Sequence, residues 1–149
     1  KPLEEEINKF ENVEYRGIDN NGNDFFIRSK IAEFEQEKPE IINMEEVIST
    51  FYFKDGTVLT IIADKGIFNN ITNDMNFADN VKMTYLDNVL YSDKAVFNNS
   101  ENQLLVSGNV DGQNSESKLK ADELDFDLNT KNLKISMYNE ERVNIKTKF

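Results

Sequence analysis

The fold is decided by residues 58–85, VLTIIADKGIFNNITNDMNFADNVKMTY, because the pattern of this stretch returns twice farther along the chain. Asp64, Asp93 and Asp122 follow one another at intervals of 29 residues. An aliphatic residue stands three positions before each Asp and a Phe four positions after it: Ile61, Leu90 and Leu119, then Phe68, Phe97 and Phe126. A fixed period of this kind predicts repeated units that bury their apolar faces by stacking on one another.

Apolar residues alternate within a unit, which is the period of a β-strand. The alternation slips once, because the step from Ala63 to Gly66 is odd. The same odd step separates Ser92 from Ala95 and Ala121 from Leu124. We therefore predict a bulge or corner at each repeated Asp.

A second break recurs where the next strand of the unit reaches Asp79-Asn80 and Gly108-Asn109. Gly and Asn tolerate positive φ, so a tight kink is accessible at both places. Each unit is predicted to be a bent strand, an Asn-rich turn and a second strand. The third unit departs from the pattern, since Asn139 stands where the others have Val81 and Val110.

The length of 149 residues suits one domain, which we assign to residues 10–149 after a charged lead-in at 1–9 that is frayed or a short helix. The chain has no Cys, His or Trp, which excludes disulfides, imidazole bases and the usual zinc sites. A formal charge of −11 argues against nucleic acid and against electrostatic docking on an anionic membrane surface.

The sequence shows no signal peptide and no stretch of about 20 apolar residues that would form a membrane helix. It begins with Lys1 rather than Met, so we interpret it as a piece whose anchor or export signal would lie upstream.

The remaining segments also read as strands and turns. Ile27, Lys30 and Phe34 match the repeat loosely and indicate a degenerate opening unit after a turn at 19–23. Residues 41–53 are predicted as a strand that a two-residue Asp55-Gly56 turn joins to the next one. Residues 142–147 form a last short strand whose edge is free.

Several segments together resemble the LptC family, the periplasmic component of lipopolysaccharide export: FENVEYRGIDNNGNDFFIRSKIAEF at 10–34, FKDGTVLTIIADKGIFNN at 53–70, LYSDKAVFNNSENQLLVSGNV at 90–110 and LKADELDFDLNTKNL at 119–133. The repeated part is similar to the soluble bridge protein LptA as well, which remains the alternative.

This resemblance implies an all-β fold, an open β-jelly roll of two facing antiparallel sheets that holds the acyl chains of lipopolysaccharide. It also implies docking of an LptA-like bridge protein at the carboxy-terminal edge, through Val143, Asn144 and Ile145, and of the inner-membrane transporter complex at the amino-terminal edge. Membership of this family would place the chain in the periplasm, anchored to the inner membrane. It would also be compatible with a homodimer. A self-assembling β-repeat protein is the structural alternative.

The inward apolar positions of the three units are the expected lipid contacts. They are Ile61, Phe68, Phe77, Leu90, Phe97, Val106, Leu119, Phe126 and Ile135. An ordinary hydrophobic core explains the same residues equally well, because core and groove wall share one periodicity.

No catalytic residue, metal ligand or cofactor is expected. The simplest role for the repeated Asp is a corner residue that accepts hydrogen bonds from local backbone amides. Calcium is the sharper alternative, although no loop matches an EF-hand or a glycine-rich nonapeptide. A hydrolase is disfavoured, since paired carboxylates need a cleft with aromatic platforms.

Overall fold

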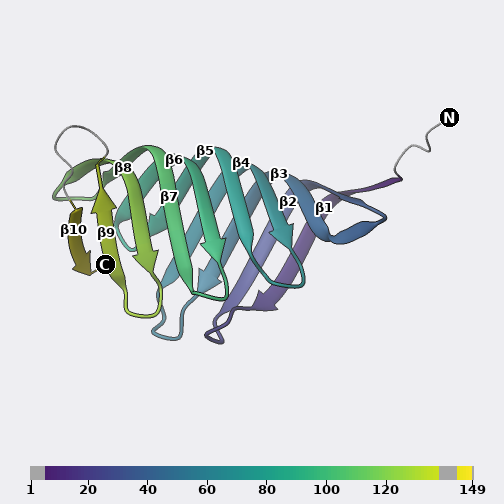
Figure 1. Cartoon of the computed structure of the whole chain (residues 1–149), viewed down its shortest axis with the longest axis horizontal. Coiled ribbons are helices and arrows are strands. Elements are labelled where there is room, and N and C mark those ends of the chain that lie inside the picture. The colour runs from purple at the N-terminus through teal and green to yellow at the C-terminus, as the bar shows by residue number, and fades with distance from the viewer. Residues whose placement is uncertain (1–5, 138–143, 149) are drawn as a thin grey trace.

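The computed structural model describes residues 6–137 and 144–148. Ten strands form one antiparallel sheet in which every strand pairs with its neighbours in sequence (Figure 1). The strands are β1 (Ile7–Ile18), β2 (Asp24–Glu35), β3 (Lys38–Tyr52), β4 (Val58–Asn69), β5 (Met75–Tyr85), β6 (Asn88–Asn98), β7 (Gln103–Gln113), β8 (Lys118–Asp127), β9 (Asn132–Ser136) and β10 (Asn144–Lys148).

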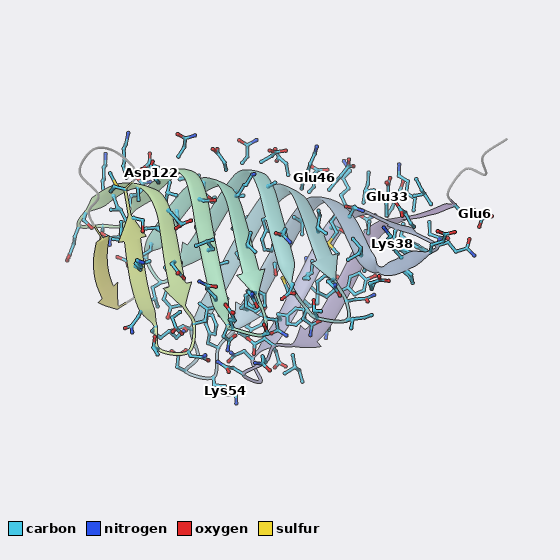
Figure 2. All side chains as sticks on the ribbon, in the orientation of Figure 1. Glu6, Glu33, Lys38, Glu46, Lys54 and Asp122 are labelled. Atoms are coloured by element: carbon cyan, nitrogen blue, oxygen red, sulfur yellow. The ribbon has the colours of Figure 1, made fainter. Side chains whose placement is uncertain are left out.

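Strands β1 to β8 all bend along one line, which we call the ridge. Strand pairing is interrupted there, and several ridge residues adopt positive φ. The ridge consists of Asn12, Lys30, Glu46, Asp64, Asn80, Asp93, Asn109 and Asp122. Figure 2 shows Glu46 and Asp122 along this upper border, with Lys54 on the opposite side.

The ridge folds the sheet into two facing layers. The odd layer ends in the turns after β1, β3, β5 and β7, and the even layer ends in the turns after β2, β4, β6 and β8. The expected open β-jelly roll is confirmed, and its two facing layers are halves of one continuous sheet.

The predicted parity slip is confirmed at each repeated Asp. Ala63 and Gly66 are both buried, while Asp64 between them is exposed. The same holds around Asp93 and around Asp122. The second break is confirmed too, because Asp79, Asn80, Gly108 and Asn109 all have positive φ.

Two of the three repeated Asp residues, Asp64 and Asp93, make a different contact from the one expected. The side-chain amide of Asn80 donates to the Asp64 carboxylate at 2.7 Å, and that of Asn109 donates to Asp93 at 2.9 Å. Each bond joins two neighbouring strands along the ridge. The repeated Asp thus works with the repeated Asn, rather than with local backbone amides alone, to hold the corner.

Two local expectations are corrected. Ile7 to Lys9 belong to β1 and are not helical, because they pair with the far end of β2. The connection after β3 is also longer than two residues: the Phe53 amide donates to the Thr57 carbonyl at 2.9 Å, and the Gly56 amide donates to the Phe53 carbonyl at 3.0 Å. Gly56 supplies the positive φ that this longer turn requires.

The carboxy-terminal strand forms as expected. Asn144 pairs with Ser136 and Ile145 with Ile135, so both lie in β10. Val143 lies outside the described residues. On its other edge β9 pairs with β8, and of β8 it reaches only the even-layer half, from Glu123 to Asp127.

Candidate functional site

The two layers are staggered against each other. Tyr15 on the odd half of β1 contacts Phe68 on the even half of β4, with ring centroids 5.4 Å apart. Phe51 on β3 contacts Phe97 on β6 at 4.9 Å. A strand of the odd layer therefore faces an even-layer strand two or three positions later in the chain. Because of this stagger, the odd-layer halves of the last long strands lie opposite the last strands of the even layer.

Aromatic side chains fill the space between the layers near the β1 end of the sheet, which we call the packed half. Phe25 lies between Phe51 and Phe68, with centroids 6.1 Å from each. Phe51 and Phe97 are fully buried. This spacing is that of a packed aromatic core, which leaves no room for a ligand.

An apolar cavity of about 510 Å³ lies between the layers nearer the β10 end of the sheet. Four of the expected lipid contacts line it: Leu90, Leu119, Phe126 and Ile135. The other five, Ile61, Phe68, Phe77, Phe97 and Val106, are buried core residues away from it.

The sequence did not single out several further wall residues: Leu59, Met83, Tyr85, Leu104, Leu124 and Leu133. The alternation of apolar residues along each strand could have identified them. Leu59, for example, precedes Ile61 by two positions and therefore lies on the same face of β4. Gly112 also lines the cavity, and a Cβ built on it would lie 2.8 Å from the Leu90 Cδ1. A larger side chain at position 112 would therefore enter the cavity.

The cavity is nearly free of charge although the chain carries 28 acidic residues. No carboxylate is among its lining residues, and Lys118 is the one charged residue among them. The polar lining is gathered near the turn after β7, at Asn88, Asn114, Ser117 and Lys118. The site thus has an apolar interior and a polar rim with a cation, which suits an amphipathic anion.

Asparagine side chains join the free margins of the two layers beside the packed half. The backbone amide of Asn20, after β1, donates to the Asn99 side chain at 2.8 Å. The Asn21 side-chain amide donates to Asn129, and that of Asn73 donates to the Ile18 carbonyl at 3.4 Å. We call this set of contacts the Asn seam.

Lys131 extends the Asn seam toward the cavity. Its ammonium lies 3.7 Å from the centre of the Phe53 ring and 5.3 Å from that of Tyr85, a cavity residue. It also reaches the Asp55 carboxylate at 4.0 Å. Hydrogen bonds from the Thr57 hydroxyl and amide, helped by the Lys131 charge, lower the pKa of Asp55.

Within residues 6–137 and 144–148, no three potential metal-ligating side chains gather into one group. No helix in this part of the chain is long and apolar enough to cross a membrane. What the described residues do provide is a cavity lined mainly by apolar side chains, with no carboxylate among its lining residues.

These features define a class of protein: an open β-jelly roll with an apolar cavity between its layers, suited to holding a lipid. The family model described as "Lipopolysaccharide-assembly, LptC-related" matches residues 6–147. The chain therefore belongs to the LptC family, whose periplasmic domain acts in lipopolysaccharide transport and interacts with lipopolysaccharide. This is a family of transport components and not a known enzyme family. A search of curated proteins gave no significant match.

Proposed function

We propose that this domain is a non-enzymatic carrier that holds acyl chains of lipopolysaccharide in the cavity between its layers. In this role it receives the lipid from an inner-membrane transporter complex and passes it to an LptA-like periplasmic bridge protein. The observation that carries the proposal is the cavity of about 510 Å³, which lies in the size range of ligand sites and has no carboxylate among its lining residues in a strongly acidic chain.

The cavity can be tested by filling it from Gly112. This residue has an ordinary φ, and its built Cβ meets the flexible end of Leu90 rather than backbone. Gly112→Ala, Gly112→Leu and Gly112→Phe should fold, and their affinity for purified lipopolysaccharide should fall in that order as cavity volume is lost. Full affinity in folded Gly112→Phe would place the lipid elsewhere.

The handover rests on the two ends of the sheet. Strand β10 is the last described strand in the order, and β1 is the first. Unpaired strand edges recruit strands from other chains, so we assign the bridge protein to the β10 edge, including Val143, Asn144 and Ile145, and the membrane complex to the β1 edge.

Deleting residues 142–149 tests the assignment of the bridge protein. The repeated units around Asp64, Asp93 and Asp122 keep their strand pairs in the shortened chain. The domain should therefore fold and still bind lipopolysaccharide, but it should no longer capture the bridge protein in a pull-down. Unchanged capture of the bridge would move the docking surface away from β10. Anchoring by a helix upstream of Lys1 remains part of the proposal, and the residue context there would test it.

A further inference from the structure

A groove of about 700 Å³ crosses β1, β2 and β3 on the outer face of the odd layer. Along β3, its wall residues Ile48, Thr50 and Tyr52 alternate with the buried Ser49 and Phe51. Alternate residues of a strand point to opposite faces of the sheet. The groove therefore lies on the outside of the molecule, and not between the two layers.

Two arginines gather at this groove, although the chain has a formal charge of −11 and only three arginines in all. Arg16 on β1 stands opposite Phe26 on β2, and its guanidinium carbon lies 4.9 Å from the centre of the Phe26 ring. The guanidinium carbon of Arg28 lies 5.1 Å from the centre of the same ring. An aromatic ring holds a guanidinium by its face and leaves the N–H groups at its edge able to donate. Phe26 thus orders two cations at one place on the surface.

The two cations differ in their partners. Arg28 forms an ion pair with Glu14 at 3.6 Å. Among the residues that the structure describes, Arg16 forms no ion pair with a carboxylate. Its guanidinium is therefore the available donor in the groove. A guanidinium can donate two parallel hydrogen bonds to a carboxylate or to a phosphate.

The neighbours of Arg16 favour a carboxylate that belongs to a peptide. Asp24 lines the groove, and Glu14 lies beside it on Arg28. A doubly charged phosphate would meet about twice the repulsion from these two groups that a singly charged carboxylate meets. Ile48 and Tyr52 in the groove wall are 40% and 51% exposed. Covering them takes apolar groups next to the anion, which a peptide supplies and a free ion does not.

We propose that this groove binds an acidic segment of a partner protein, with a carboxylate of the partner on Arg16 and an apolar side chain against Ile48 and Tyr52. The contact uses the face of the sheet, so both sheet edges and the cavity between the layers stay free. A second copy of the chain is disfavoured as the partner, because two chains of charge −11 repel each other. A membrane is disfavoured because a broad surface does not enter a groove.

Photo-crosslinking in cells that produce the full-length protein tests the partner. A benzoyl-phenylalanine at Thr50 lies in the groove, and one at Asn76 lies on the outer face of the even layer as the control. Mass spectrometry identifies the captured segment. We expect capture at Thr50 alone, of a segment of another protein in which acidic residues outnumber basic ones.

A matched pair of substitutions tests the role of Arg16 in this capture. Arg16→Gln should reduce the capture at Thr50 about fivefold or more. Lys94→Gln removes the same charge from an exposed position of the even layer and should leave capture within about twofold. Thermal melting verifies that both variants fold. Equal losses in the two variants would overturn the proposal, as would no capture, or capture of lipid, of a second copy or of a segment without an excess of acidic residues.

A defined probe tests the chemistry with the purified protein. Binding of a fluorescein-labelled peptide of alternating Glu and Leu is measured by anisotropy at about 0.15 M salt, where a Debye length of about 8 Å screens repulsion from distant carboxylates. Arg16→Gln should weaken binding about fivefold or more, and Arg16→Lys, which keeps the charge but not the planar fork, should weaken it less. Equal binding of a Gln–Leu peptide would overturn the assignment of a carboxylate to Arg16. Gly112→Phe should leave the binding unchanged, so the result is independent of the proposed carrier function.

Discussion

The interior near the β1 end of the sheet and the interior near the β10 end differ in what lies between the layers, although strand β6 contributes to both. In the packed half, near β1, Phe51 meets Phe97, whereas in the other half Leu90, Leu119 and Phe126 face a cavity. The stagger of the layers explains the difference, because the even layer ends where the odd halves of the last long strands need a partner. The same position of the repeat can therefore lie in the packed core or in the wall of the cavity, according to what lies opposite.

The largest effect is expected from truncation in the packed half. Phe97→Ala removes a fully buried ring and should lower the free energy of unfolding by about 3–5 kcal/mol, measured by urea denaturation. Phe126→Ala is the matched change in the cavity wall, where the ring is only half-buried. Phe126→Ala should lower the free energy of unfolding clearly less than Phe97→Ala, and it should reduce the affinity for lipopolysaccharide. Equal losses of stability in the two variants would contradict the difference between packed core and cavity wall.

The next largest effect is expected beside the ridge, at the residues that precede Asn109 and Asn80. Gly108 has φ +83°, and a Cβ there would lie 2.7 Å from Asp93. Gly108→Ala should therefore lower the free energy of unfolding by about 1–3 kcal/mol. Asp79 takes the corresponding place in the first unit with φ 67°, so Asp79→Gly should be neutral or stabilise by up to about 1 kcal/mol. If both substitutions lowered the free energy of unfolding, backbone φ would not be what determines the preferred residue at these two positions.

The Lys131 contact should have a smaller effect. Lys131→Met keeps a flexible chain over Phe53 and Tyr85 but removes the charge, and should lower the free energy of unfolding by about 0.5–2 kcal/mol. Hydrogen exchange should then rise at the turns after β3 and β8 and remain unchanged at the ridge. Faster exchange throughout the sheet would indicate a general loss of stability instead of a local contact across the margin.

The smallest effect concerns Asp55, an exposed residue. Its pKa is lowered, so its ionised form contributes stability at pH values above the ordinary pKa of Asp, and this contribution disappears as pH falls through the lowered pKa. Asp55→Asn should therefore reduce the melting temperature slightly at pH 7 and leave it unchanged at the acidic end, where the natural side chain is also neutral. A difference that grows toward low pH would contradict this sign.

Much of the fold was predictable because its causes are local. The bulge between Ala63 and Gly66 follows from the apolar alternation within one strand. The kink at Gly108-Asn109 follows from residue types that tolerate positive φ. The partner of Asp93 was harder, since Asn109 lies on the neighbouring strand although the 29-residue period repeats the pair. Its prediction required pairing register as well as composition.

The division into core and cavity was not predictable from periodicity. Phe97 and Phe126 occupy the same position of the repeat, and their different surroundings come from the stagger of the layers. The Asn seam was hidden for the same reason: Asn20 and Asn99 read as turn residues, and their contact joins positions 79 residues apart. Both features depend on how distant halves of the sheet face each other.

The central claim, that one half is packed and the other holds lipid, is tested most directly by site-specific photo-crosslinking. A benzoyl-phenylalanine placed at Phe126 or at Phe68 replaces one aromatic ring by a larger one in each half, and thermal melting verifies that both variants fold. With purified lipopolysaccharide, capture is expected at Phe126 and not at Phe68, which lies against Tyr15 and Phe25. Equal capture at both positions, or capture at Phe68 alone, would contradict the account.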